Sequence, residues 1–207
     1  MDVTRPVVSG MPVWPGDAPC AVEWTARIGT DSAANVAEIR CSAHTGTHAD
    51  GPYHVLEEGA RIGTAPLEAF IGRARVVRVA AGTVLDEEWA RSVLEDHAPE
   101  RLLIHTGAWT APSVFPTAFA APTPEAARLL ASGGLRLLGT DAPSVDPYDS
   151  ADLAAHRVLL AAGIAILENL LLDDVAEGEY DLIALPLRLM EADASPVRAV
   201  LRPLPAP

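Results

Sequence analysis

Residues 44–54 limit the local backbone more than any other segment of the chain. They read His-Thr-Gly-Thr-His-Ala-Asp-Gly-Pro-Tyr-His, with glycine at positions 46 and 51 and proline at position 52. Glycine is unfavourable inside a helix, proline interrupts one, and the two threonines are β-branched. We therefore expect an extended segment with a tight turn at Gly46, which glycine can make because it has no Cβ.

The residues before this segment predict a strand that ends at His44. Small or apolar residues alternate with polar ones from 37 to 43, although Val36 interrupts the polar face. A period of two is typical of a half-buried strand. His44 would then begin a loop held by a rigid scaffold, where functional side chains are often found.

Three histidines and one aspartate within these eleven residues indicate a metal site. Imidazole nitrogens and carboxylate oxygens are ligands of zinc and manganese, and the segment has no cysteine to suggest a structural zinc site. His44 and His48 stand four apart, as in helical zinc motifs, but glycine and proline exclude a helix here. We interpret the segment as a catalytic metal site; the alternative is a solvated turn that happens to be rich in histidine.

A second source of ligands follows the apolar run from Val158 to Leu167. Glu168 comes directly after this run, where a carboxylate costs on the order of several kcal/mol unless it is paired, hydrogen-bonded or bound to a cation. His156 precedes it by twelve residues, and a turn at Gly163 would bring the two together. Spacing alone leaves open whether they share one site, because a lone histidine on a helix is often structural.

The bulk composition bounds the class of function. The chain has 15 Lys and Arg against 28 Asp and Glu, and its net charge of -13 opposes binding to nucleic acid or to anionic membranes. A hydrophobic fraction of 49% excludes a disordered chain, and 207 residues can form one domain with a substantial core. We expect a single domain over residues 1–207, with a proline-rich tail at about 202–207.

Cysteine usage and the N-terminal residues indicate the compartment. Cys20 and Cys41 have no Cys-x-x-Cys or disulfide-framework spacing, so we expect free thiols in a reducing environment. The first residues lack the pattern of a signal peptide. The longest strongly apolar run has ten residues, well short of the roughly 20 that span a bilayer. We therefore expect a cytoplasmic protein that does not enter membranes.

Strand and helix signals alternate along the chain. Its 18 prolines exceed the usual share of about 5% and favour short elements joined by turns. Helices are expected after Asp86, after Thr123 and Pro124, and from about 151 to 162 before Gly163. Strands are expected at 73–80, 101–104, 135–138, 164–167, 182–189 and 197–201. This alternation, without an internal repeat, predicts the α/β class with a mixed sheet.

Two motifs make the chain similar to a known family. The pattern His44-x-Gly-Thr-His48-x-Asp50-x-Pro-x-His54, together with residues 166–170, resembles the cyclase-like metal-dependent hydrolases. Within that family the chain is most similar to the bacterial kynurenine formamidases. The similarity continues through 12–17, 141–146, 185–189 and 192–198 and so covers nearly the whole sequence. It implies one compact domain with a central barrel-like mixed sheet and flanking helices, of the swivelling β/β/α type, usually as a homodimer.

The resemblance also implies a binuclear zinc centre, with two ions per subunit and manganese as the alternative metal. His44, His48 and Asp50 match the ligands of the first ion. Asp50, His156 and Glu168 match those of the second, so Asp50 would bridge the two ions.

Two further residues have counterparts in the family. His54 matches the catalytic acid/base, and Trp14 matches an aromatic residue that contacts the substrate. Gly51 and Tyr53 occupy variable positions of the motif, and Thr140 stands where a branched aliphatic residue is common. These departures leave the ligand set intact and concern the shape of the pocket, and so the choice of substrate.

The implied reaction is that of an arylformamidase, the hydrolysis of N-formyl-L-kynurenine to L-kynurenine and formate in tryptophan degradation by the kynurenine route. Zinc would acidify a water molecule, and His54 would pass a proton to the departing aryl amine. Trp14 would stack on the aryl ring, unless it only packs within its loop.

Two alternative functions fit the same residues. The chain can instead be another hydrolase of the same family, one that opens isatin or a cyclic amide, or a non-catalytic metal-binding protein.

His97 and His105 are expected to be surface or core residues, and Asp141 and Asp146 to cap turns.

Overall fold

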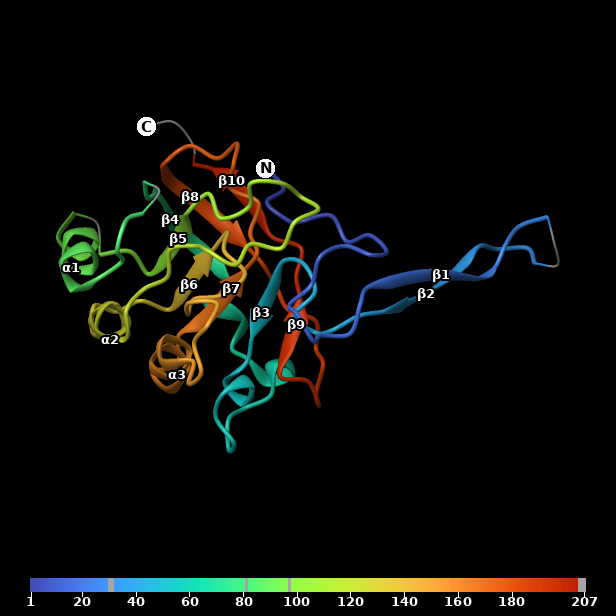
Figure 1. The fold of residues 1–207 in the computed structure, drawn as a ribbon, viewed down its shortest axis with the longest axis horizontal. Helices are drawn as coiled ribbons and strands as arrows, with labels where there is room; N and C mark the ends of the chain where they lie inside the picture. The colour runs from blue at the N-terminus through green and yellow to red at the C-terminus, as the bar shows by residue number, and fades with distance from the viewer. Residues whose placement is uncertain (30–31, 81, 97, 205–207) are drawn as a thin grey trace.

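The computed structural model describes residues 1–29, 32–80, 82–96 and 98–204 (Figure 1). Within these residues an eight-stranded sheet has the order β10-β8-β4-β5-β6-β7-β3-β9. The strands are β3 (His48–Asp50), β4 (Ile71–Arg78), β5 (Arg101–His105), β6 (Leu137–Thr140), β7 (Ala165–Glu168), β8 (Gly178–Ile183), β9 (Ala194–Pro196) and β10 (Val200–Pro203). Strands β4 to β7 are parallel and the outer pairs are antiparallel, so the mixed sheet is confirmed.

Three α-helices cover one face of this sheet (Figure 1). They are α1 (Glu87–Asp96), α2 (Pro124–Ser132) and α3 (Ala154–Ala161), and short 3-10 turns lie at η1 (Pro52–His54), η2 (Ile62–Thr64) and η3 (Leu67–Ala69).

The two helix starts predicted from capping residues are confirmed. Asp86 Oδ1 accepts the N–H of Trp89 at 3.0 Å, and Thr123 Oγ1 accepts the N–H of Ala126 at 3.1 Å. Helix α3 begins at Ala154, three residues later than expected, because Leu153 before it has a left-handed backbone with φ 49°.

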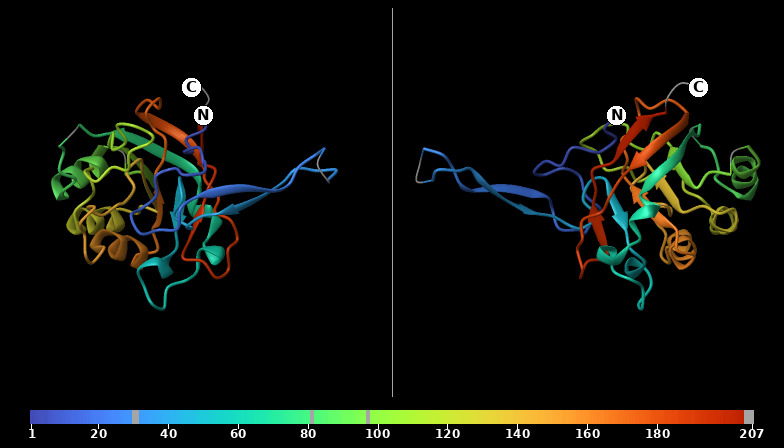
Figure 2. Two further views of the ribbon diagram at one scale, coloured as in Figure 1. Left: turned by 45° about the vertical axis from the view of Figure 1, so that its right-hand side comes forward. Right: turned by 180° about the vertical axis from the view of Figure 1, so that it is seen from behind.

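The sheet is buried on both faces because strand residues alternate between two cores. In β5, Leu102 and Ile104 pack toward the helices, while Leu103 packs into a second core on the opposite face. Strands buried in this way read as continuous apolar runs, as β5 and β6 do. The sheet curls around the second core as a half-barrel (Figure 2), which confirms the expected α/β, barrel-like architecture.

Two expectations for the C-terminal third are corrected. Strand β8 ends at Ile183, not at residue 189, before Pro186, which cannot donate a ladder hydrogen bond. Arg202 and Pro203 belong to β10 and pair with β8, so the expected tail begins later than residue 202. Residues 205–207 lie outside the described part of the chain.

A second, two-stranded sheet projects from the body as an arm (Figures 1 and 2). It consists of β1 (Ala21–Ala26) and β2 (Val36–Arg40), paired antiparallel. The strand expected before His44 is therefore present, but it ends at Arg40 and is not half-buried, since Ile39 on its apolar side is 65% exposed. The alternating pattern predicted the strand but not its surroundings.

No helix in the described residues has the length and apolar character needed to cross a membrane.

Candidate metal centre

Strand β3 places the centre of the histidine motif at the middle of a three-stranded antiparallel region. His48 and Asp50 are two residues apart on this strand and so point to the same face. Across the ladder, His48 pairs directly with Glu168 of β7, and His48 Nε2 lies 3.4 Å from Glu168 Oε2. The register of two strands therefore joins the motif to the carboxylate that follows the apolar run.

His44 joins this group through a turn. Gly46 has φ 64°, the left-handed conformation that favours glycine, and the chain reverses there as expected. His44 Nδ1 lies 3.1 Å from Asp50 Oδ1, and His48 Nε2 lies 3.4 Å from the same oxygen. His44, His48 and Asp50 form one group of ligand-type atoms.

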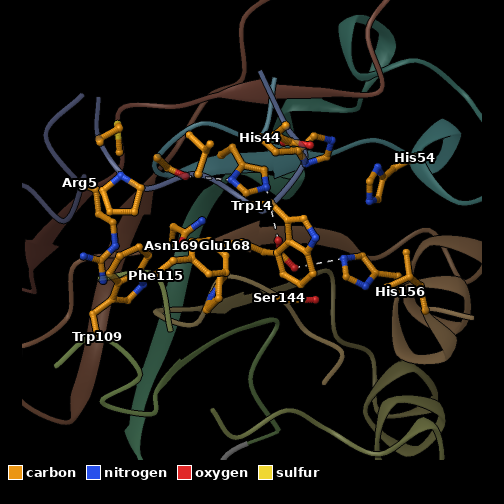
Figure 3. Close-up of a pocket in the computed structure, with 18 of the residues that line it drawn as sticks. Arg5, Trp14, His44, His54, Trp109, Phe115, Ser144, His156, Glu168 and Asn169 are labelled. Carbon is orange, nitrogen blue, oxygen red and sulfur yellow. Dashed lines mark hydrogen bonds and ion pairs between the residues drawn. The ribbon is translucent and has the colours of Figure 1, made fainter. Parts of the chain in front are cut away.

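His156 of α3 completes a second group on the other oxygen of Asp50. Its Nε2 lies 3.5 Å from Asp50 Oδ2 and 3.1 Å from Glu168 Oε1. Asp50, His156 and Glu168 thus form a group beside the first, with Asp50 common to both. Figure 3 shows His156 and Glu168 of this group at the pocket. The structure brings together all five residues that the sequence suggested as ligands, including the pair whose spacing left the question open.

The buried polar atoms at this point fit a divalent cation. His48 Nε2 and both carboxylate oxygens of Asp50 are buried, and none has a hydrogen-bond partner in the described structure. Unpaired buried carboxylate oxygens are costly, and the neighbouring imidazoles approach them without hydrogen-bond geometry. Nitrogen and oxygen donors without thiolate suit zinc or manganese. The donor set therefore fits the metal that the motif predicted.

In the metal-free protein, the carboxylates of this group raise the pKa of the neighbouring histidines. Burial alone would lower the pKa of both histidines, but the carboxylates of Asp50 and Asp193 raise the pKa of His44 to about 10. In the same way Asp50 and Glu168 raise the pKa of His48 to about 9. His44 and His48 are therefore protonated in the metal-free protein near neutral pH, and metal binding must release these protons.

Contacts outside the two groups fix the rings of the histidines. The Nδ1–H of His48 donates to the carbonyl of Gly46 at 2.9 Å, which leaves Nε2 free to face Asp50. The Nδ1–H of His156 donates to Asp146 Oδ2 at 2.7 Å. Such partners set the tautomer and orientation of metal-binding imidazoles.

Asp146 has a larger role than the turn cap expected from the sequence. Its carboxylate accepts the N–H groups of Ala155 and His156, each at 2.9 Å, and so caps the start of α3 while it orients the ring of His156. Sequence position gave no signal for this contact, because the two residues meet only when the loop folds back on the helix.

His54 lies beside these two groups and forms a third group of ligand-type atoms with His44 and Asp193. Its Nδ1 is 3.1 Å from Asp193 Oδ2, and the same oxygen lies 3.0 Å from His44 Nε2. The hydrogen bonds from His44 and His54 hold the pKa of Asp193 well below its usual range. Asp193 lies in the segment 192–198 that resembles the family, but the sequence carries no local signal for this contact, because it depends on the pairing of β9, which follows Asp193, with β3.

Gly51 is more constrained than a variable position of the motif would be. Its N–H donates to the carbonyl of Asp193 at 2.7 Å. A Cβ at this position would lie 2.9 Å from that carbonyl oxygen and 2.9 Å from the backbone nitrogen of Ile62. The glycine therefore allows the loop of Asp193 to approach the motif closely.

A cavity of about 300 Å³ opens beside the candidate ligands. Trp14 lines it, as expected for a substrate contact, and packs against Phe115 at 5.5 Å and Tyr148 at 5.3 Å between ring centroids. Figure 3 shows His54 and His156 on one side of this pocket and Arg5 with Trp109 on the other. The cavity is therefore lined by candidate metal ligands at one end and by aromatic side chains along its wall.

The remaining polar residues lie apart from the candidate ligands. His105 is buried at the end of β5, with Nε2 3.4 Å from Asp173 Oδ1, and does not line the cavity. Asp141 accepts the backbone N–H groups of Thr106 and Gly107, which fits the expected turn role. Thr140 is buried, and its Oγ1 accepts the N–H of Ala142. His97 lies outside the described residues.

Comparison with known proteins gives matches along the whole chain. The Cyclase family model matches residues 1–147. A structure of a potential metal-dependent hydrolase with cyclase activity shares 30% identity and a TM-score of 0.81, covering 97% of this chain and 96% of that one. A "predicted metal-dependent hydrolase" from Bacillus stearothermophilus shares 29% identity, with a TM-score of 0.82 and coverage of 97% and 96%. Isatin hydrolase A from Labrenzia aggregata shares 25%, with a TM-score of 0.83 and coverage of 97% and 92%.

Proposed function

The chain belongs to the Cyclase family and has the fold of its metal-dependent hydrolases, and from this premise we propose that it hydrolyses N-formyl-L-kynurenine to L-kynurenine and formate. The observation that carries the proposal is the buried carboxylate of Asp50. Its two unpartnered oxygens face two different groups of imidazole and carboxylate ligands, beside a cavity with an aromatic wall.

Five residues would hold two metal ions, for which we propose zinc. His44, His48 and Asp50 would hold the first, and Asp50, His156 and Glu168 the second. When bound, such ions act as Lewis acids that polarise an amide oxygen and make water more acidic. Asp146 and Gly46 support the centre by fixing the tautomers of His156 and His48.

His54 is the proposed proton carrier. Its Nδ1–H donates to Asp193, so Nε2 remains available at the wall of the cavity. An anilide nitrogen is a poor leaving group until it is protonated, and a positioned imidazole can deliver that proton as the C–N bond breaks.

The cavity suits a small aromatic amide. Its volume of about 300 Å³ lies at the lower end of the range for ligand sites. Trp14 and Phe115 line the cavity and present rings against which a single aryl ring can stack, and Tyr148 packs against both of them.

A second candidate is the opening of isatin or a related cyclic amide. The similarity to isatin hydrolase A favours it, since such an enzyme would use the same ligands and differ only in the pocket. A non-catalytic metal-binding role is disfavoured by the His54–Asp193 pair, which stands next to the candidate ligands and faces a cavity.

We further propose that the protein is a homodimer in which the arm packs against a second copy. The arm leaves Trp24 50% exposed and Ile39 65% exposed. A set of exposed apolar side chains on a projecting hairpin is typical of an interaction surface. We also propose that the protein acts in the cytoplasm, which its two free cysteines support.

The test is a formamidase assay with metal analysis on one zinc-loaded sample. Formation of L-kynurenine from N-formyl-L-kynurenine, followed by absorbance and lost on chelation, is the expected result. Rapid opening of isatin without turnover of the formamide would assign the second candidate. Metal content without turnover of either compound would favour a binding protein.

A further inference from the structure

Arg5 lies at the end of the cavity away from His54 and His156 (Figure 3). The residue is 8% exposed, and its guanidinium carbon lies 4.0 Å from the ring centroid of Trp109. Among the residues that line the cavity, Arg5 is the single lysine or arginine. A buried cation thus stands across the cavity from the candidate metal ligands.

The donors at this end of the cavity have no acceptors. Within the described residues, the guanidinium of Arg5 forms no hydrogen bond or ion pair, and its Nε is fully buried. The indole Nε1 of Trp109 is likewise buried without an acceptor. Burial of an unpaired charge costs more free energy than stacking on a tryptophan returns. An anionic acceptor would satisfy both of these donors, the charged guanidinium of Arg5 and the indole N–H of Trp109.

The position of Arg5 is coupled to that of the metal ligands. Its backbone N–H donates to Thr47 Oγ1 at 2.9 Å, and that hydroxyl donates to the carbonyl of Asn169 at 2.6 Å. Thr47 precedes His48, and Asn169 follows Glu168. The separation between the cation and the candidate ligands is therefore set by backbone hydrogen bonding to the strands that carry them.

Arg5 keeps its charge at neutral pH. Burial lowers the pKa of its guanidinium to about 10, while the carboxylates of Asp141 and Asp173 act in the opposite direction. Neither carboxylate is within ion-pair distance of Arg5. Asp141 accepts hydrogen bonds from the backbone N–H groups of residues 106 and 107, and Asp173 lies within hydrogen-bond distance of His105. Both therefore support the charge without neutralising it locally.

We propose that Arg5 and Trp109 form an anion subsite that binds a carboxylate on the substrate, at the end opposite the scissile amide. A guanidinium offers the planar donor geometry that a carboxylate matches, and the indole N–H adds a further donor. The inference rests on the proposed function and narrows its substrate class to aromatic amides that carry a remote carboxylate. Neutral aryl amides of the same size would lack this contact.

The kinetic test compares two substrates that differ by one carboxylate, N-formyl-L-kynurenine and N-formylkynuramine. Arg5→Met removes the charge and keeps the length of the side chain, and Arg5→Lys keeps the charge. Arg91→Met is the control, because Arg91 is an exposed arginine of α1 that lines neither the cavity nor the arm. Circular dichroism and zinc content establish that each variant is folded and loaded.

The quantity measured is the ratio of kcat/KM for N-formyl-L-kynurenine to that for N-formylkynuramine, which keeps the amine and lacks the carboxylate. Arg5→Met is expected to lower this ratio about tenfold or more, since it removes a charge-assisted hydrogen bond to the carboxylate. The loss should lie mainly in KM. Arg5→Lys should recover part of the ratio, and Arg91→Met should keep the wild-type ratio. An unchanged ratio in folded Arg5→Met would overturn the proposal.

A binding measurement separates this inference from the proposed function. Calorimetry with zinc-loaded protein compares L-kynurenine with kynuramine, which lacks the carboxylate. If wild-type protein hydrolyses neither substrate, the proposed function fails, but a preference for L-kynurenine that disappears in Arg5→Met still supports the subsite. Absence of that preference in the wild type, including no measurable binding of either ligand, contradicts it.

Discussion

Asp193 Oδ2 lies 3.1 Å from His54 Nδ1, although 139 residues separate the two in the chain. This contact arises because β9, which follows Asp193, pairs with β3 inside the histidine motif. The carboxylate fixes which nitrogen of His54 carries its proton and leaves the other at the cavity. Acid/base chemistry at His54 thus depends on a residue from the other end of the sequence.

Replacement of His54 by alanine should remove the proton carrier and leave the metal ligands in place. We expect kcat to fall about 10²–10⁴-fold, the usual contribution of a positioned acid or base, with zinc content unchanged. Steady-state kinetics and metal analysis on one preparation give both values. His105→Asn, a buried histidine outside the cavity, should keep most of the wild-type rate. A near wild-type kcat in His54→Ala would refute its role.

Asp193→Asn should impair catalysis by a different route. Asparagine can still accept a hydrogen bond from His54 but replaces a charged acceptor with a neutral one, and charge-assisted hydrogen bonds are roughly twice as strong as neutral ones. Loss of such an outer partner typically costs 10- to 100-fold, so we expect a fall in kcat of about tenfold or more. A pH–rate profile should change in shape as well as height. If kcat and its pH dependence stay as in the wild type, Asp193 does not position His54.

Glu168→Ala should weaken the second ion selectively. Glu168 contacts both His48 and His156, so its loss removes a ligand from the group that includes Asp50 and His156. Inductively coupled plasma analysis after dialysis should show loss of one of the two proposed ions. Glu57→Ala, an exposed surface change, is the control. An unchanged metal content would exclude Glu168 as a ligand.

The metal-free protein should lose stability as pH rises above neutrality. His44 and His48 have pKa values raised to about 10 and about 9 by neighbouring carboxylates. A raised pKa in the folded state contributes stability that is complete below the unfolded value of roughly 6.5 and is lost as pH passes through 9–10. Urea unfolding of chelator-treated protein should therefore show a free energy of unfolding that falls from pH 7 to 10. Zinc should bind more tightly over the same interval, because it competes with fewer protons.

The arm should determine the oligomeric state. Ile39→Asp places a charge on its exposed apolar surface and is expected to convert a dimer into a monomer, as measured by light scattering. Val84→Asp provides the matched control, since Val84 is 66% exposed on another part of the surface. A wild-type monomer, or an Ile39→Asp dimer of unchanged affinity, would contradict the proposed interface.

Local chemistry in the sequence was sufficient for the features that depend on neighbouring residues. Gly46 and Pro52 disfavour an α-helix through the motif; Gly46 adopts a left-handed turn, and Pro52 begins only the short 3-10 turn η1. Asp86 and Thr123 cap the helices that follow because their side chains reach N–H groups only three residues ahead. The ligand types of residues 44–50 likewise follow from composition at short range, which is why the motif could be interpreted as a metal site.

Tertiary structure alone decided what depends on strand pairing and burial. Glu168 meets His48 because β3 and β7 share a ladder, and Asp193 reaches His54 through β9. The sequence also does not predict the exposure of Ile39 or the burial of Arg5. Neither an alternating pattern nor a single arginine specifies which elements pack against the residue. Residue type and short spacing thus determine which chemistry is available. Long-range packing determines which of those groups meet, and how far each is removed from water.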